Sequence, residues 1–444
     1  MRFISSIAAA VLVAASSSAL ANSDRHVDVI VSLNDGGPAT EHAANRAEAA
    51  NFAASFGVQA NRVYGAALTG FSASVPEARL DALRDHPRVN SVTMNGRVTT
   101  MQGNCPHCGG GNDDDDGDDG GQETPWGIER VGADGNNNTG DGISVYILDT
   151  GIDASHEDLA DNLGNGYAVE TCEEGGGGGG PFGGSSNDDC QADWDDDQGH
   201  GTHVAGTVGA IDNDIDVVGV APDVTLHSVK VLDSGGGGAW DGVIEGIDWV
   251  TQQAIERGES VIANMSLGGG GSKSGECTDN GFTGDDAMHE ALCNGKNAGV
   301  VWVVAAGNDG EDAANSAPAA YDDAVITVSA TEEGDDWTSW SNWGNDSADW
   351  TSNTSAPVAI AAPGAAIEST SLGGGTESMS GTSMAAPHVA GGAALLLRSN
   401  PQSADASAFH NIRSGLLNTA EDTGSFSNTS GNPHDEDFLD ASGL

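Results

Sequence analysis

Five short apolar runs, separated by helical segments, constrain the fold of this chain more than any other feature. The runs are rich in β-branched residues, which is typical of parallel strands buried on both faces. The segments between them have the periodicity of amphipathic helices, as expected for crossover connections. Residues 143–330 therefore predict an α/β domain, a doubly wound, mostly parallel sheet flanked by helices, with its site at the carboxyl ends of the strands. The runs are ISVYILD (143–149), VTLHSVKVL (224–232), SVIANMSL (260–267), GVVWVVAAGN (299–308) and AVITVSA (324–330).

A smaller domain is predicted before this one. Three strand-like runs alternate with two helix-like segments, which is the pattern of a small α+β domain. The strand-like runs are 27–33, 63–75 and 89–94, and the helix-like segments are 39–56 and 77–86. Residues 103–121 follow as an acidic Gly/Asp linker, because they offer almost no apolar side chain to bury. The aspartates of this linker lack the spacing of a calcium-binding loop, so we interpret them as a solvated charge run.

The first 21 residues predict export. Arg2 precedes an apolar stretch that runs from Ile4 to Leu20, and Ala19-Leu20-Ala21 suits signal peptidase. We therefore expect residues 1–21 to be a signal peptide. No later segment holds about 18 consecutive apolar residues, so we expect a secreted, extracellular product without a membrane anchor.

The charge balance excludes some classes of partner. Lys and Arg number 15 against 67 Asp and Glu, for a formal net charge of −52. Such a surface repels nucleic acid phosphates and anionic membranes, so we expect neither as a partner. Two compatible interpretations remain: adaptation to high salt, where mobile ions screen the self-repulsion, and a calcium-rich secreted protein.

The six cysteines of an exported chain favour disulfide bonds. Two pairs are close in sequence and would each close a loop rich in Gly and Asp. These pairs are Cys172 with Cys190 and Cys277 with Cys293. Cys105 and Cys108 form a CPHC pair that is compatible with a strained small-loop disulfide, a fragment of a metal site or bonds to other partners.

Three polar residues stand where a strand ends or a helix begins. Asp149 ends an apolar run in YILDTGID, His200 begins a helical segment in DQGHGTHVAG, and Ser383 precedes a buried helix in SMSGTSMAAPHVAG. Each alone has an ordinary structural interpretation: a cap or calcium ligand, a surface histidine and an N-cap. A serine hydroxyl becomes a nucleophile only when a base lies beside it, so the three residues predict chemistry only together.

In the order Asp149, His200, Ser383, these motifs resemble those of the subtilisin-like serine proteases, the subtilases. The resemblance extends from Gln122 to about Ala441 and implies a serine endopeptidase that acts on proteins and peptides. By this resemblance Ser383 attacks the peptide carbonyl and His200 accepts its proton and donates it to the leaving amine. Asp149 then holds the imidazole tautomer and stabilises the imidazolium.

The resemblance also assigns the donors for the oxyanion. Asn308, in VVAAGNDG, matches the oxyanion asparagine of the family, and the N–H of Ser383 is the natural second donor. His203 and His388 match structural histidines of the family, and we expect neither to act as the base.

Substrate-binding segments follow by position. Gly236, Gly237 and Gly238 resemble the edge segment that pairs with an extended substrate, although a flexible glycine loop is the alternative. Ser266, Leu267 and Gly268 resemble the opposite wall of the main side-chain pocket. Ser316 aligns with the base of that pocket, which implies a preference for large apolar or aromatic residues before the cleaved bond. Trp240 would border the pocket for the side chain three residues further upstream.

A structural calcium ion is the cofactor that the family implies. Its tight site combines side chains and carbonyl groups into an all-oxygen shell suited to Ca²⁺. The matching ligands are the side chains of Gln122, Asp158 and Asn213 and the carbonyls of Ile211, Ile215 and Val217.

Residues 22–102 resemble the subtilase propeptide, which acts as an intramolecular chaperone and then as an inhibitor. The family usually cuts just before the glutamine region, but here about twenty extra residues intervene, so we expect the cut between about 100 and 122. Residues 122–444 then form the catalytic domain. Nothing follows FLDASGL, so we expect no additional carboxyl-terminal domain. The architecture that the resemblance implies works as a monomer, so we expect a monomer.

Other functions fit the sequence less well. A serine hydrolase of the α/β-hydrolase type needs G-x-S-x-G, but position 385 is Ala. A phosphate-binding loop needs Gly-Lys-Ser/Thr, which GGGGSKS lacks. A secreted calcium-binding or adhesive module predicts a short regular repeat, and none is visible. A protease that has lost its activity and serves only for binding would lack a catalytic residue. The four residues matched to catalytic roles are all present: Asp149, His200, Asn308 and Ser383.

Overall fold

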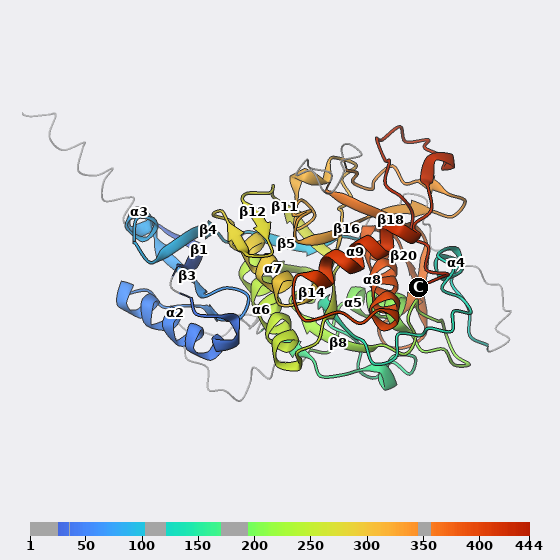
Figure 1. Cartoon of the computed structure of the whole chain (residues 1–444), viewed down its shortest axis with the longest axis horizontal. Helices are drawn as coiled ribbons and strands as arrows, with labels where there is room; N and C mark the ends of the chain where they lie inside the picture. The colour runs from blue at the N-terminus through green and yellow to red at the C-terminus, as the bar shows by residue number, and fades with distance from the viewer. Residues whose placement is uncertain (1–24, 35, 103–120, 170–193, 345–356) are drawn as a thin grey trace, which may run out of the picture.

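The computed structural model describes residues 25–34, 36–102, 121–169, 194–344 and 357–444 (Figure 1). The predicted signal peptide, most of the predicted linker and four of the six cysteines lie outside these residues. No described helix is both long enough and apolar enough to cross a membrane.

The amino-terminal domain is an α+β unit, drawn in blue in Figure 1. Its antiparallel sheet has the order β2-β3-β1-β4. The elements are β1 (His26–Leu33), α2 (His42–Phe56), β2 (Arg62–Tyr64), β3 (Gly70–Pro76), α3 (Leu80–Arg84) and β4 (Val89–Met94). Phe52 of α2 and Phe71 of β3 are fully or almost fully buried in its core. The sequence predicted this domain, but it predicted one strand over 63–75 where the structure has β2, β3 and an intervening loop.

The second domain is built on the predicted sheet. Its strand order is β17-β16-β14-β10-β6-β8-β7, with β18 beside β16, and only β17 runs antiparallel to its neighbour. The strands are β6 (Ser144–Asp149), β7 (Tyr167–Ala168), β8 (Thr225–Lys230), β10 (Val261–Met265), β14 (Val300–Ala305), β16 (Val325–Glu332), β17 (Asp336–Trp337) and β18 (Val358–Pro363).

Helices cover both faces of this sheet, and the central strand β6 shows why. Alternate residues of a strand point to opposite faces. Val145 and Ile147 pack in one cluster with α5 (His200–Gly209), α8 (Thr382–Ser399) and α9 (Ser407–Thr419). Tyr146 and Leu148 pack in the other with α6 (Trp240–Arg257) and α7 (Ala287–Asn297). The doubly wound fold class is thereby confirmed.

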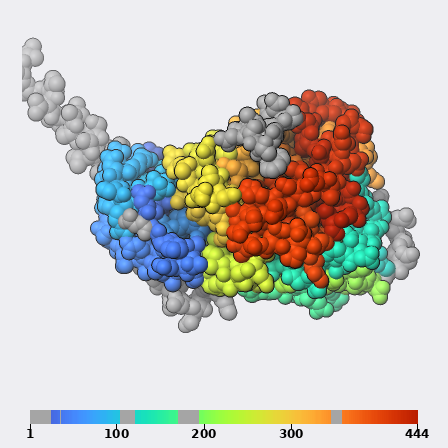
Figure 2. Space-filling view, in the orientation of Figure 1, coloured from blue at the N-terminus to red at the C-terminus, as the bar shows by residue number. Residues whose placement is uncertain are grey.

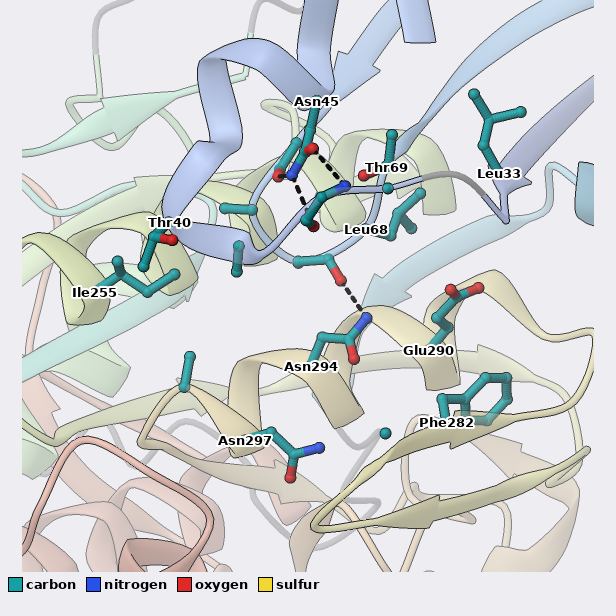
Figure 3. A pocket seen from close by; sticks show the side chains of 18 of the residues that line it. Leu33, Thr40, Asn45, Leu68, Thr69, Ile255, Phe282, Glu290, Asn294 and Asn297 are labelled. Atoms are coloured by element: carbon teal, nitrogen blue, oxygen red, sulfur yellow. Dashed lines mark hydrogen bonds between the residues drawn. The ribbon is translucent and has the colours of Figure 1, made fainter. Parts of the chain in front are cut away.

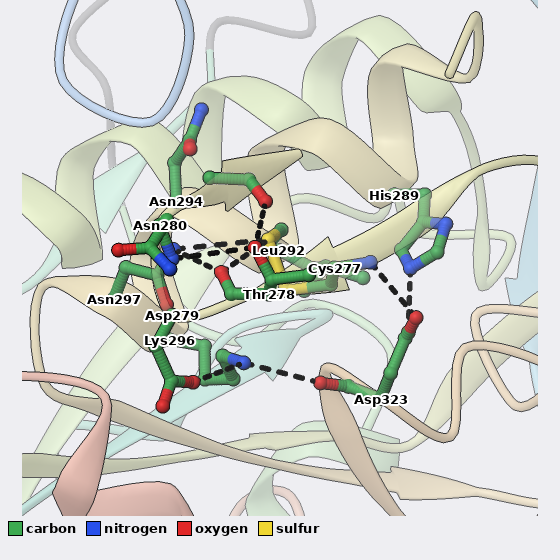
Figure 4. The surroundings of a disulfide bond; sticks show 12 residues. Cys277, Thr278, Asp279, Asn280, His289, Leu292, Asn294, Lys296, Asn297 and Asp323 are labelled. Carbon is green, nitrogen blue, oxygen red and sulfur yellow. Dashed lines mark hydrogen bonds and ion pairs between the residues drawn. A yellow bond between two sulfur atoms is a disulfide. The ribbon is translucent and has the colours of Figure 1, made fainter. Parts of the chain in front are cut away.

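A disulfide bond between Cys277 and Cys293 fastens a hairpin to α7 (Figure 4). The hairpin consists of β12 (Glu276–Thr278) and β13 (Gly281–Thr283). This pairing was predicted from the sequence and is confirmed. Beside it the buried Lys296 ammonium contacts Asp279 and the Asp323 carbonyl, each at 3.3 Å.

Candidate active site

Asp149 and His200 come together at the carboxyl end of strand β6. Asp149 is the last residue of β6, His200 is the first residue of α5, and both side chains are fully buried. Nδ1 of His200 lies 2.8 Å from Oδ1 of Asp149, and the same oxygen accepts a hydrogen bond from the Thr150 N–H at 2.7 Å. A carboxylate at Nδ1 places the proton on that nitrogen and leaves Nε2 free to accept one.

Ser383 is the second residue of α8. Gly381 holds the N-cap position, and no side chain caps the helix, so the alternative that Ser383 is an N-cap is wrong. The Ser383 hydroxyl donates instead to the carbonyl oxygen of Ser266 at 3.0 Å. Nε2 of His200 has no hydrogen-bond partner among the described residues. The hydroxyl and the imidazole are therefore not hydrogen-bonded to each other in this state.

A peptide carbonyl occupies the space next to Ser383. The oxygen of Met101 accepts hydrogen bonds from Nδ2 of Asn308 at 2.5 Å and from the backbone N–H of Ser383 at 3.3 Å. The Asn308 amide is held in this orientation because its Oδ1 accepts from both the N–H and the hydroxyl of Thr382 at 2.9 Å. Two donors that converge on one carbonyl oxygen are what an acyl-transfer site presents to a developing oxyanion.

The chain leading to Met101 lies in the site as an extended strand. β5 (Arg97–Thr100) is one of the two inner strands of an antiparallel sheet with the order β15-β11-β5-β9. On one side Val98 and Thr99 pair with Gly238 and Gly237, and the Thr100 N–H donates to the Gly236 carbonyl. On the other side Thr100 and Thr99 pair with Leu267 and Gly268, and the Met101 N–H donates to the Ser266 carbonyl. The neighbouring strands are β9 (Gly237–Ala239), β11 (Leu267–Gly270) and β15 (Ser316–Ala317).

The Met101 side chain packs against Gly268. A Cβ atom on that glycine would lie 2.4 Å from Cε of Met101 and 2.9 Å from the Ala317 carbonyl oxygen, so a larger residue would displace the Met101 side chain and crowd the backbone. A cavity of about 410 Å³ here is also lined by Ser316, and by the acidic Asp309 and Glu311. Three residues upstream, Val98 is buried in a cluster against which Trp240 packs.

The two other histidines of the motifs lie away from the nucleophile. Nε2 of His203 donates to the carbonyls of Ile367 and Glu377, and Nδ1 of His388 donates to the carbonyl of Met384. Burial lowers the pKa of His203 to about 3 and the pKa of His388 to about 4. Both rings are therefore neutral near pH 7.

The six predicted calcium ligands also lie together. Nε2 of Gln122 donates to the carbonyls of Ile211 and Val217 at 2.6 and 2.8 Å, and Asn213 and Asp158 are hydrogen-bonded at 2.7 Å. The Ile215 N–H donates to Oδ1 of Asn213. Asp158 is fully buried, and this burial raises its pKa to about 6.

This donor set fits a calcium ion. The carbonyl oxygens of Ile211 and Val217 both point at Nε2 of Gln122. Among the described residues, the carboxylate of Asp158 accepts hydrogen bonds only from neutral donors, the Asn213 amide and the Val217 N–H. A hard cation satisfies such oxygens better than an amide hydrogen does. No group of three or more His, Cys, Asp or Glu side chains suited to a metal occurs in the described ranges, and Asp158 is the one ionisable side chain among the six predicted ligands.

Sequence reasoning missed the contact between the two domains. Figure 2 shows the small domain as a lobe against the larger one. Oδ1 of Asp248, fully buried on α6, accepts hydrogen bonds from the N–H groups of Gly65, Ala66 and Ala67 at 2.6 to 3.0 Å, and Oδ2 lies 2.6 Å from Nη2 of Arg46. The split between β2 and β3 is explained by this loop, whose N–H groups face a carboxylate rather than a strand.

Further contacts extend this interface along α6 and α7. Asp241 and Glu245 of α6 both bind Arg62 of the small domain. Nδ2 of Asn294 on α7 donates to the Ala67 carbonyl at 2.7 Å, at the wall of an interdomain cavity of about 810 Å³ (Figure 3). The acidic residues 241, 245 and 248 share one face of α6, and this spacing is the sequence signal that would have revealed the interface.

Known proteins resemble this chain over most of its length. Residues 140–436 match the Subtilase family, and residues 28–101 match the Peptidase inhibitor I9 family. The chain is 36% identical over 355 residues to the Extracellular serine proteinase of Thermus sp. (strain Rt41A), covering 78% of this chain and 70% of that protein. It is 36% identical over 313 residues to Subtilisin DY of Bacillus licheniformis, covering 68% and 93%.

A solved structure gives the same picture of the fold. The crystal structure of a cold adapted subtilisin-like serine proteinase is matched with a TM-score of 0.55 and 33% identity. The match covers 71% of this chain and 97% of that one.

Proposed function

Because the chain belongs to the subtilase family of serine peptidases, we propose that it is the precursor of a secreted endopeptidase that cleaves peptide bonds through an acyl-enzyme on Ser383. The observation that carries the proposal is the Met101 carbonyl, held by Asn308 Nδ2 and the Ser383 N–H beside the nucleophile. The small domain is the inhibitor, and its tail lies in the site as a substrate would.

The reaction follows from the positions of these groups. The Ser383 hydroxyl turns from the Ser266 carbonyl to Nε2 of His200, which accepts its proton as the oxygen attacks the carbonyl carbon. Asp149 stabilises the imidazolium that forms. The two donors stabilise the oxyanion, His200 gives the proton to the leaving amine, and water then hydrolyses the ester by the same steps in reverse.

The first bond cut is the one between Met101 and Gln102. Its carbonyl is the one that the two donors hold, and β5 has substrate-like pairing on both sides. Within the range of about 100 to 122 expected from the sequence, this choice makes Gln102 the first residue of the mature enzyme. The extra residues before Gln122 then stay with the catalytic domain.

Large apolar residues are the expected side chains before the cleaved bond. Met101 fills the space beside Gly268, and Ser316 is small and neutral at the pocket wall. Asp309 and Glu311 line the same cavity, so acidic side chains should be rejected by like charge.

Gln122, Asp158, Asn213 and the carbonyls of Ile211, Ile215 and Val217 would hold a structural calcium ion. The ion would neutralise the buried Asp158 and fasten the segment around Gln122 to the loop after α5.

The enzyme is further proposed to be extracellular, monomeric and adapted to high salt. The net charge of −52 supports salt adaptation, because mobile ions screen the repulsion among carboxylates.

The first experiment is fluorophosphonate labelling of the secreted protein in high salt with calcium, followed by mass spectrometry and compared with Ser383→Ala. An adduct on Ser383 that is absent from the variant supports the proposal. Folded protein that is free of the inhibitor domain and takes no label would reject it.

A further inference from the structure

Lys230 is a buried lysine directly beside the candidate triad. It is the last residue of β8, and its Cα pairs with that of Asp149 on the parallel strand β6. Its side chain is only 9% exposed, in a chain that has three lysines in all. Nζ donates to the carbonyl oxygen of Thr150 and to Oδ1 of Asp197, the latter at 2.6 Å.

The Thr150 carbonyl belongs to the turn that carries the Asp149 carboxylate. The N–H of Thr150 donates to Oδ1 of Asp149, the oxygen that also binds His200. The Thr150 hydroxyl accepts from the N–H of Gly201 at 2.9 Å, in the first turn of α5. A group that fixes Thr150 therefore acts on both partners of the Asp149–His200 hydrogen bond.

The second contact of Lys230 lies in the segment that leads to His200. Asp197 is half exposed, and its neighbour Asp196 accepts hydrogen bonds from Gly199, just before His200, and from Thr202 just after it. Lys230 thus bridges the end of the Asp149 strand and the start of the His200 helix.

We propose that Lys230 is a positioning residue for the peptidase reaction, which fixes the Asp149–Thr150 turn through the Thr150 carbonyl and so aligns the carboxylate with His200. The proposal rests on the roles proposed above for Asp149, His200 and Ser383. Burying an ammonium is unfavourable unless it is well paired. The Lys230 ammonium could pair with the partly exposed Asp197 at the surface. It must be buried to reach the Thr150 carbonyl, so the contact with Thr150 accounts for its burial.

The decisive variant is Lys230→Met, which keeps the length of the stem and removes the donor. A misplaced carboxylate should lower kcat for a peptide anilide by about ten- to a hundredfold while KM stays within about twofold, because substrate contacts are untouched. The same loss should appear in the rate at which the refolded precursor cuts itself. Lys230→Gln retains an N–H donor without the charge, so it should recover part of the lost rate.

Lys273→Met is the matched control. This variant also removes an ammonium that is paired with carboxylates, since Nζ of Lys273 lies 2.7 Å from Oδ1 of Asp322 and 2.9 Å from Oδ2 of Asp323. None of these contacts involves the triad. The kcat of Lys273→Met should remain that of the parent even if its thermal midpoint falls. Asp197→Asn should cost less kcat than Lys230→Met, because the Thr150 contact remains.

The outcomes separate this proposal from the proposed function. A parent protein without peptidase activity would reject the function itself. An active parent with a Lys230→Met kcat within twofold would reject only the role of Lys230, as would an equal loss in Lys273→Met. If Lys230→Met does not fold, Lys230→Leu takes its place as the variant without a donor, and an unchanged kcat in that variant rejects the role.

Discussion

The carbonyl oxygen of Met101 lies 2.5 Å from Nδ2 of Asn308, and it also accepts a hydrogen bond from the N–H of Ser383. The inhibitory tail therefore presents a reactive carbonyl to the same donors that would stabilise its oxyanion. The rate at which the precursor cuts itself after Met101 should therefore measure directly how well these donors and Ser383 work.

Replacing Asn308 by Leu should slow self-cleavage by about a hundred- to a thousandfold, because one of the two oxyanion donors is lost. The rate can be followed on gels after refolding the precursor. Asn280→Leu, on the hairpin loop by the disulfide, should cleave at the parent rate. A loss below tenfold in Asn308→Leu would contradict the donor role.

The position of Met101 predicts which substitutions its bond tolerates. Met101→Leu should still be cut before Gln102, because the new side chain is apolar and of similar size. Met101→Glu should be cut about a hundredfold more slowly, since the pocket would bury an unpaired charge near Asp309 and Glu311. Amino-terminal mass spectrometry of the products checks both, and a mature terminus other than Gln102 in the parent would contradict the assignment.

The contact of Asp248 with the small domain predicts the strength of inhibition. Asp248→Asn should weaken inhibition by the separate small domain about a hundredfold, since it disturbs a buried ion pair and three hydrogen bonds. Glu256→Gln is the matched change on the same helix. Its pair with His42 spans 3.5 Å and is half exposed, so it should matter less than about threefold. Equal effects of the two substitutions would contradict the role of Asp248 in holding the small domain.

In the uncut chain Met101 lies in the site while Gln122 already contacts the other proposed calcium ligands, and residues 102–121 connect the two positions. The uncut precursor should therefore bind calcium. In the Ser383→Ala precursor, added calcium should raise the thermal midpoint, and Gln122→Ala should weaken binding by about tenfold. Calorimetry measures both. Calcium binding that appears only after cleavage would contradict the prediction.

The sequence predicted the sheet because each strand is an apolar run that packs on both faces, as Val145 and Tyr146 do. It predicted Asp149, His200 and Ser383 as a set because their motifs are long and ordered. The loop Gly65–Ala67 was misread as strand, since its partner Asp248 lies about 180 residues away and the residues of the loop itself do not indicate that contact. Lys230 was missed for the same reason: its role depends on a carbonyl, which no sequence motif marks.

The buried histidines predict how stability depends on pH. Burial lowers the pKa of His203 to about 3 and that of His388 to about 4, whereas in the unfolded chain a histidine titrates near 6.5. As the pH falls below about 6.5, the unfolded state binds protons that the folded state does not. The free energy of unfolding should therefore fall by up to about 1.4 kcal/mol per pH unit for each histidine, until the folded pKa is reached.

His388→Gln isolates one of these contributions. Chemical unfolding of the Ser383→Ala protein should show a slope against pH, between about 6 and 4.5, that the added His388→Gln change reduces by about 1.4 kcal/mol per pH unit. Above pH 7 both proteins should have the same slope, because a histidine there is neutral in both states. Parallel curves over the whole range would mean that His388 does not remain neutral in the folded protein, and burial would then not control its titration.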